Sequence, residues 1–312
     1  MEIQELDSTK FENIFPSPYF VYGRSDFSLL NKQKVEKLLF FAFKESKYRL
    51  GLTVGLRDTA LFTPFSAPFG GFIFLKDNIK INYIDDALSK LCDWAIEEGY
   101  NSLHLTLPPL IYDQSFIAKQ INALYRAGFI ISKIDLNYHF NLNKFDDNYL
   151  FSIEYNARKN LKTAFENNLM FKECKFEDER QLAYNIIKDN REARGFPLSM
   201  TWEQVNETIK LVKSDFFLVT NDDNINIASA IVFYIAKNMV QVVYWGDIPE
   251  YSHLRTMNFL SFKMFEYYKK TDIKIVDIGP STENSIPNFG LCEFKESLGC
   301  DIQPKITFLK KL

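Results

Sequence analysis

The chain combines two hydrophobic periods, and the regular change between them predicts its secondary structure. From Ile84 to Ala95 apolar positions recur every three or four residues, and Gly99 follows them, as is typical of an amphipathic helix and its C-terminal cap. Shorter apolar runs bounded by Gly, Pro, Ser and Asn are typical of strands and turns. The elements expected in the first half are strands 49–56, 59–65, 102–107 and 129–142, with a turn at 66–71, and helices 84–99 and 116–128.

The second half repeats this alternation after two or three leading helices. Thr201 and Gln204, three residues apart, predict a capping box that begins one of these helices. Short turn sequences separate the next three apolar segments, which predicts an antiparallel meander. The last strand should run parallel to the third meander strand, because a helix connects the two. The elements expected here are helices 153–167, around 182–187, from 201, and 254–270, and strands 216–220, 227–235, 239–245 and 273–278.

The two halves resemble each other at their ends. Segment 124–129 precedes a strand that ends at Leu142, and segment 296–300 precedes one that ends at Leu309. We therefore expect a duplicated unit of the α/β (α+β) class, each copy a mixed, mostly antiparallel sheet flanked by helices. The polar stretch Asp146-Asp147-Asn148 places the expected boundary between a domain of residues 1–145 and a domain of residues 150–312.

Composition narrows the class of protein. With 312 residues, of which 46% are hydrophobic, the chain can bury two cores, which excludes wholesale disorder. Its 37 basic and 40 acidic residues give a net charge of −3, so we expect no DNA partner and at most a small footprint on RNA. We expect neither a signal peptide nor a membrane span. The sparse cysteines Cys92, Cys174, Cys292 and Cys300 are expected to be reduced thiols of a cytoplasmic protein.

Candidate chemistry collects at the expected carboxyl ends of the two parallel strands, where ligands bind in open α/β sheets. One end is Tyr244-Trp245-Gly246-Asp247, and the other is Asp277 to Thr282. Small polar residues follow the second end, and turn formation is the alternative role for them. The candidates for substrate or donor binding at this edge are Tyr244, Trp245, Gly246, Ser281, Thr282, Asn284, Ser285 and Asn288.

Segments 277–283 and 288–299 resemble the tandem-GNAT acyltransferases, which include the Fem-type peptidoglycan aminoacyl transferases; Phe69, Gly70 and Gly71 belong to a fainter match. The resemblance implies two GNAT-like domains, with the reaction centre in the second and the acceptor site shaped by the first. It also implies transfer of an acyl group from coenzyme A, or of an aminoacyl group from tRNA, to an amine. Lys295, in the stretch Phe-Lys-x-x-x-Gly, would lie beside the reacting ester. Stretch 247–253 lacks the glycines of the usual coenzyme A pyrophosphate loop.

Acyl transfer to an amine needs a base, donors for the oxyanion and an acid for the leaving group. Asp247 and Asp277 are the candidate bases, although carboxylates at strand ends also cap turns. Lys295 is the candidate for stabilising negative charge, and an exposed lysine paired with Glu293 or Glu296 is the alternative. An apolar stripe of Leu291, Phe294 and Leu298 is expected to anchor its helix and leave Lys295 beside it, so Lys295→Met should hardly change the melting temperature. Backbone N–H groups near Trp245 and Gly246 are the expected oxyanion donors.

Four cationic residues complete the candidate set. His253 and Arg255 stand before a predicted helix, where they could bind phosphate or cap the helix. Arg191 and Arg194 end another helix, where they could bind an anionic substrate or interact with the helix dipole. No metal-binding spacing is present. Two functions are left open: an N-acyltransferase with an acyl-CoA or aminoacyl-tRNA donor, and a non-catalytic ligand-binding protein that retains the tandem fold.

Overall fold

The computed structural model describes residues 1–76 and 78–312, which form two compact units. Unit 1 comprises Met1–Leu136, Thr282–Ile286 and Gln303–Leu312, and unit 2 comprises Asn137–Ser281 and Pro287–Ile302. The chain therefore passes between the units several times, rather than once near residues 145–150.

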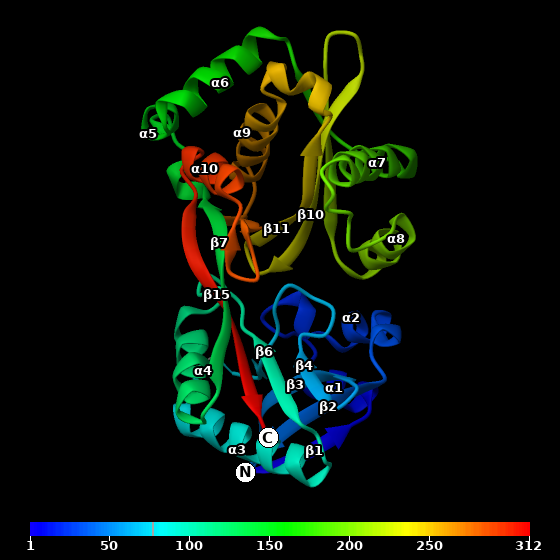
Figure 1. Cartoon of the computed structure of the whole chain (residues 1–312), viewed down its shortest axis with the longest axis vertical. Coiled ribbons are helices and arrows are strands. Elements are labelled where there is room, and N and C mark those ends of the chain that lie inside the picture. The colour runs from blue at the N-terminus through cyan, green and yellow to red at the C-terminus, as the bar shows by residue number, and fades with distance from the viewer. Residues whose placement is uncertain (77) are drawn as a thin grey trace. The chain divides into compact units, whose positions relative to one another are not determined.

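Unit 1 contains a sheet with helices on both faces (Figure 1). Its elements are β1 (Glu2–Leu6), α1 (Ser8–Ile14), η1 (Val21–Gly23), α2 (Ser25–Leu30), η2 (Lys32–Lys34), β2 (Lys37–Lys44), β3 (Tyr48–Arg57), β4 (Ala60–Thr63), β5 (Ile73–Phe74), α3 (Ile81–Glu97), β6 (Ser102–Thr106) and α4 (Gln114–Arg126). The strand order is β1-β2-β3-β4-β6-β15, where β15 spans Asp301–Lys311, and β5 pairs with β3. Only β4 and β6 run parallel among these pairs.

The core of unit 1 follows from side-chain alternation along its strands. Leu50, Leu52 and Val54 of β3 point to the face that α3 and α4 cover, and these helices bury their own apolar stripes there, as the sequence predicts. Aromatic residues of α1 cover the opposite face, where the rings of Phe11 and Phe40 lie 5.1 Å apart.

Unit 2 has the sheet order β7-β12-β11-β10-β9-β8. Its elements are β7 (Ile130–Asn141, shared with unit 1), η3 (Leu142–Lys144), α5 (Tyr149–Ser152), α6 (Tyr155–Glu166), β8 (Met170–Glu173), α7 (Glu177–Ala193), α8 (Trp202–Leu211), β9 (Ser214–Thr220), β10 (Asn226–Ala236), β11 (Met239–Asp247), η4 (Pro249–Leu254), α9 (Thr256–Lys269), β12 (Ile275–Pro280) and α10 (Phe289–Ser297). The expected meander β9-β10-β11 is antiparallel, and β11 and β12 are parallel, so both predictions are confirmed. The sequence did not predict strand β8.

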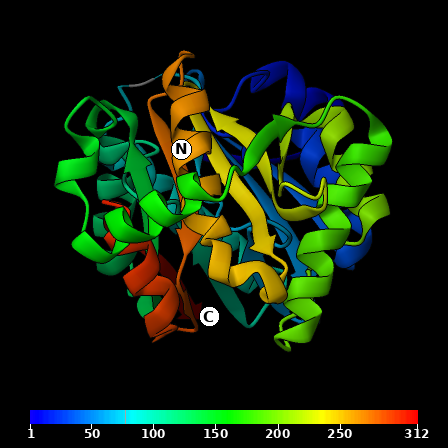
Figure 2. The same cartoon turned by 90° about the horizontal axis from the view of Figure 1, so that it is seen from above.

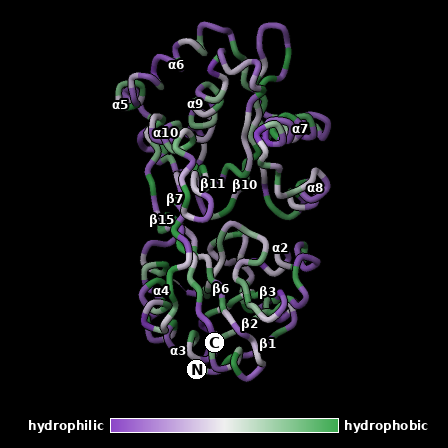
Figure 3. Tube along the Cα trace, viewed as in Figure 1, coloured by the Kyte–Doolittle hydropathy of each residue, from purple (hydrophilic) through white to green (hydrophobic). Residues whose placement is uncertain are grey.

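Strand β10 separates two helical layers of unit 2. Ala228, Ala230 and Val232 belong to the core that includes the apolar residues of α6 and α9, whereas Ser229 donates a hydrogen bond to the carbonyl of Ala183 in α7. Figure 2 accordingly shows α9 and α7 on opposite sides of the strands. In Figure 3, hydrophobic residues lie along β10 and β11, and hydrophilic ones dominate α6.

The strands of the two units follow the same plan. In each, three antiparallel pairs are followed by one parallel pair and then by an antiparallel sixth strand. The sixth strand is exchanged: β7, which follows α4, pairs with β12 in unit 2, and β15, which follows α10, pairs with β6 in unit 1. This exchange explains why the units differ from the linear boundary that the sequence suggested.

Candidate functional site

Strands β11 and β12 pair for only part of their length, and this creates a fork in unit 2. Their parallel pairing runs from Met239 with Ile275 to Gln241 with Asp277 and stops there. β11 continues to Asp247, whereas β12 continues to Pro280 with a bulge between Asp277 and Gly279. Gly279 has a φ of 71°, a conformation that glycine adopts without strain. The ends of β11 and β12 therefore separate, and the side chains at the two ends have different neighbours.

Asp277 lies at the start of the fork and is fully buried. Its Oδ1 accepts hydrogen bonds from Asn137 Nδ2 at 2.8 Å and from the backbone N–H of Gly279 at 2.9 Å, and its Oδ2 accepts one from Gln241 Nε2 at 2.7 Å. A carboxylate whose two oxygens are both engaged holds strands together and has little capacity left to take a proton from a substrate. The geometry favours an anchoring role for Asp277 over the role of base.

Lys295, on α10, is 1% exposed and directs its ammonium at the end of β12. Its Nζ donates to the carbonyl oxygens of Ile278, Gly279 and Pro280 at 3.0, 2.9 and 3.2 Å. Burial lowers the pKa of Lys295 to about 8, and the Arg191 guanidinium acts in the same direction. The lysine is therefore not the exposed, carboxylate-paired residue of the alternative interpretation.

The buried face of α10 differs from the expected stripe. Cys292, Lys295 and Leu298 are buried, while Leu291 and Phe294 are only partly buried. A charged residue can occupy this face because the carbonyl groups of β12 accept all three ammonium hydrogens. The ring of Tyr138 adds a cation–π contact at 5.2 Å.

Two buried polar atoms near Lys295 have no hydrogen-bond partner among the described residues: Arg191 Nε and Ser281 Oγ. Arg191 lies in the last turn of α7, which packs against β10 and β11, and Ser281 follows β12 directly. Burial raises the pKa of Tyr244, and the Arg191 guanidinium opposes that shift, so Arg191 interacts electrostatically with both Tyr244 and Lys295. Buried polar groups are usually paired, so these two atoms can take a hydrogen-bond partner from a water or a ligand.

Asp247 does not lie next to Asp277. It stands six residues beyond Gln241 on β11, or roughly 20 Å along an extended strand. Asp247 Oδ2 accepts a hydrogen bond from Thr256 Oγ1 at 2.9 Å, and its Oδ1 lies 3.9 Å from Arg194. The sequence-predicted pair of carboxylates therefore occupies two separate places, one at the fork and one at the beginning of α9.

The connection between β11 and α9 does not fit a pyrophosphate. It forms the 3₁₀ helix η4, in which Pro249 has no N–H and the N–H groups of Tyr251 and Arg255 donate to carbonyls within the connection. The Asp247 carboxylate already lies at the beginning of α9, where a bound phosphate would benefit from the helix dipole. These residues do not fit the phosphate-binding loop that a coenzyme A donor uses, and we derive no step through it.

Several predicted binding residues have local structural contacts. Thr282 Oγ1 donates to Asp135 at 2.7 Å and accepts from the Leu136 N–H. Asn284 and Ser285 have φ values of 51° and 68° and form the turn between β13 (Thr282–Glu283) and β14 (Ile286–Pro287). Asn288 Oδ1 caps α10 by accepting from the Leu291 N–H. These contacts match the turn and capping chemistry that was the alternative role.

The other predicted residues lie in three further places. His253 and Arg255 are exposed, in η4 and at its end, and His253 Nδ1 lies 3.0 Å from the Glu250 carbonyl. Trp245 packs against Phe294, with ring centroids 5.9 Å apart, and thereby connects β11 with α10. A Cβ on Gly246 would meet Asn190 at 3.2 Å, so this glycine allows close packing of α7. Phe69, Gly70 and Gly71 belong to unit 1, where both glycines line a pocket.

Sequence reasoning missed Asn137, Tyr138 and Gln241. The two amide side chains hold Asp277, and Tyr138 lies beneath the Lys295 ammonium with its hydroxyl donating to Glu296 at 2.7 Å. A polar side chain within an otherwise apolar strand was the feature of the sequence that could have identified them.

Over the described residues, the structure contains no cluster of three or more His, Cys, Asp and Glu that could hold a metal ion. No helix within residues 1–76 and 78–312 is long and apolar enough to cross a bilayer.

The fold is that of Fem-like tandem GNAT proteins. FemX superposes with a TM-score of 0.70 at 13% identity, over 100% of this chain and 98% of FemX. The C-terminal domain of a putative lysylphosphatidylglycerol synthetase from Agrobacterium fabrum gives 0.61 at 9% identity, over 97% of this chain and 92% of that one. A tandem GNAT protein from the clavulanic acid biosynthesis pathway gives 0.56 at 9% identity, over 99% and 98%. No protein-family model and no curated protein matches the sequence.

Proposed function

We propose that the protein is an acyltransferase that moves an acyl or aminoacyl group from an ester or thioester donor to an amine, with its reaction centre at the fork of unit 2. The proposal is supported by the fold shared with FemX and with the C-terminal domain of a putative lysylphosphatidylglycerol synthetase. The second name describes the synthesis of a lysyl ester by that protein. The observation that carries it is that Arg191 Nε and Ser281 Oγ are buried without a hydrogen-bond partner among the described residues. The Arg191 guanidinium helps to lower the pKa of Lys295, and Ser281 follows Pro280, whose carbonyl accepts from Lys295.

In this proposal each residue has a separate role. The amine attacks the donor carbonyl, the carbonyl oxygen gains negative charge, and the ester oxygen or thioester sulfur leaves with a proton. Arg191 Nε and Ser281 Oγ donate hydrogen bonds to the oxyanion, because these two atoms have no hydrogen-bond partner among the described residues. Lys295 is a positioning residue: its three hydrogen bonds fix the end of β12, and its charge adds positive potential. We assign no base at the fork, because Asp277 is engaged by three donors and Asp247 lies at the beginning of α9.

The donor we favour does not depend on a pyrophosphate loop, because η4 and Asp247 fill the corresponding place. An aminoacyl ester of tRNA meets this condition, and an acyl-CoA bound in another manner is the second possibility. The acceptor is an amine of a class that the site does not specify.

The test is a donor screen followed by a transfer assay. The protein is mixed with aminoacyl-tRNAs and with acyl-CoAs, and the melting temperature is measured, because a ligand that binds only the folded state raises it. Donors that bind are then assayed for transfer of a labelled acyl group to a mixture of amines. Arg191→Met and Ser281→Ala should each lower turnover by one to two orders of magnitude while the protein stays folded. Lys159→Met, at an exposed lysine of α6, is the control and should leave turnover unchanged.

A non-catalytic ligand-binding protein is the second candidate. It is favoured by one observation, that all three hydrogens of the Lys295 ammonium are engaged by backbone carbonyls. A donor that raises the melting temperature through Arg191 but gives no transfer with any amine would favour this second function. Transfer that is unaffected by Arg191→Met and Ser281→Ala would show that the reaction centre lies elsewhere.

A further inference from the structure

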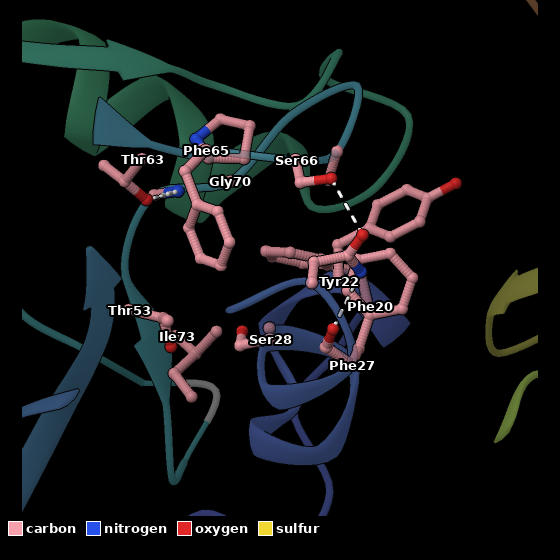
Figure 4. Close-up of a pocket in the computed structure, with 15 residues that line it drawn as sticks. Phe20, Tyr22, Phe27, Ser28, Thr53, Thr63, Phe65, Ser66, Gly70 and Ile73 are labelled. Atoms are coloured by element: carbon pink, nitrogen blue, oxygen red, sulfur yellow. Dashed lines mark hydrogen bonds between the residues drawn. The ribbon is translucent and has the colours of Figure 1, made fainter. Parts of the chain in front are cut away.

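Two hollows in the described part of the chain differ greatly in size. The pocket of unit 1 that Figure 4 shows encloses only about 20 Å³. That is room for a single water, which accounts for Thr53 Oγ1, an atom buried without a partner among the described residues. A groove beside α5 and α6 of unit 2, the α6 groove, encloses about 480 Å³. Because an apolar cavity of about 150 Å³ already holds a benzene ring, the α6 groove has room for a large side chain.

The α6 groove combines apolar and basic side chains. Its lining consists of Leu150, Arg158, Leu161, Lys162, Phe165 and Glu166. Leu161 is buried, whereas Leu150 and Phe165 remain 38% and 42% exposed, so apolar surface lies open to solvent. Arg158 donates to the Leu150 carbonyl at 3.3 Å, and Lys162 lies 3.9 Å from Glu166 in a pair that is exposed on both sides. Such an exposed pair is worth little, so both cations can interact with an incoming anion.

An exposed aromatic side chain with acidic neighbours stands beside the α6 groove. Phe151 directly follows Leu150 in α5 and is 78% exposed, so it does not fill the groove of its own chain. Residues 146–155 contain the exposed carboxylates Asp146, Asp147 and Glu154 and no basic residue. Within the described residues, none of these three carboxylates forms an ion pair. The chain therefore presents an acidic, aromatic projection next to a basic, apolar groove.

We propose that two copies of the chain form a two-fold symmetric dimer in which the Phe151 ring of each copy enters the α6 groove of the other. A two-fold axis uses the same surface on both copies, so the contact between projection and groove is made twice. The carboxylates around each ring then approach Arg158 and Lys162 of the other copy. Burial of the ring supplies affinity, and the opposite charges set the register of the two copies.

Sedimentation velocity of the full chain at a series of concentrations tests the dimer. We expect a monomer–dimer equilibrium whose dissociation constant rises at least tenfold in Phe151→Ala, because an aromatic anchor is lost from each groove. Phe176→Ala removes a phenylalanine of unit 2 that is similarly exposed, at 70%, and is the matched control that should change nothing. A chain that stays monomeric, a dimer that Phe151→Ala does not weaken, or assembly beyond a dimer would each overturn the proposal.

Charge exchange tests which surfaces meet. The groove variant carries Arg158→Glu and Lys162→Glu, and the projection variant carries Asp147→Lys and Glu154→Lys. Each variant alone should be monomeric, because like charges then face each other in both contacts, whereas an equal mixture should form a heterodimer in which both contacts are attractive. Circular dichroism checks that each variant is folded, and Lys162→Glu with Glu154→Lys is the milder pair if the groove variant is not. Homodimers of either folded variant, or a mixture that stays monomeric, would show that projection and groove do not meet, whatever the result of the transfer assay.

Discussion

The side-chain amide of Gln241 donates a hydrogen bond to the carboxylate of Asp277 across the last residue pair that joins β11 to β12, with 2.7 Å between Nε2 and Oδ2. Beyond this pair the strands are not paired with each other. The bond therefore stands where the sheet of unit 2 opens, and the N–H of Gly279 and the amide of Asn137 hold the same carboxylate from the other side.

We predict that Asp277→Asn lowers the free energy of unfolding by about 2–4 kcal/mol, because an amide nitrogen would face at least one of these donors. Urea denaturation of the variant and the parent chain measures this. Asp86→Asn, on the exposed side of α3, is the control and should have almost no effect. Equal stability of Asp277→Asn and the parent would mean that the carboxylate does not anchor the fork.

For Lys295→Met, the structure changes our expectation. Removing a donor to three buried carbonyls should lower the free energy of unfolding by about 1–3 kcal/mol, besides lowering turnover. The melting temperature should therefore fall, and Lys159→Met, an exposed lysine of α6, should leave it unchanged. If the variant keeps normal stability but has no transfer activity, Lys295 acts only in the reaction, as the sequence suggested.

The titration of Lys295 gives a prediction about pH. Because burial lowers its pKa to about 8, the folded chain releases this proton before the unfolded chain, whose lysine retains an ordinary pKa near 10.5. Between these values the unfolded state binds more protons, so this group makes stability rise with pH, by at most about 1.4 kcal/mol per unit. The stability difference between the parent and Lys295→Met should therefore grow in favour of the parent between pH 8 and 10.5. NMR of labelled lysine checks the pKa, and a value near 10.5 would refute the prediction.

Two glycine variants should shift stability in opposite directions. At Gly55 a Cβ would meet both Phe65 and Val35 at 2.6 Å, so Gly55→Ala should cost about 1–3 kcal/mol. At Gly290, within α10, the nearest atom is Asn288 Oδ1 at 3.8 Å, so Gly290→Ala should stabilise by about 0.5–1 kcal/mol through helix propensity. Thermal unfolding measures both, and a neutral Gly55→Ala would mean that the Phe65 ring is not packed on β3.

The sequence predicted the elements in which a regular hydrophobic pattern continues over many residues. Helix α3 buries Ile84, Leu88 and Leu91 on one stripe, and the meander of unit 2 has distinct turns between its strands. Strand β2 was missed because five successive residues, 39–43, are buried, and a strand buried on both faces shows no alternation. Strand β8 has only four residues and none is fully buried, so its pattern is too short to recognise.

The candidate site was predicted in part. The sequence identified four residues of the site, Lys295, Asp277, Ser281 and Arg191. It did not allow their contacts to be predicted. The partners of Lys295 are backbone carbonyls, which every residue carries and no sequence pattern distinguishes. Asp247 and Asp277 were expected together because strand ends meet at one sheet edge, yet β12 reaches Asp277 at the last pair with β11, six residues before β11 ends.

The exchange of the sixth strands affects when the sheet of unit 1 can be completed during synthesis. During translation, residues 1–136 leave the ribosome before residues 303–312, so their sheet still lacks β15, the partner of β6, to which Phe308 belongs. Unit 1 is therefore incomplete until the residues of unit 2 have been made, and loss of β15 directly removes a strand from the unit that contains residues 1–136.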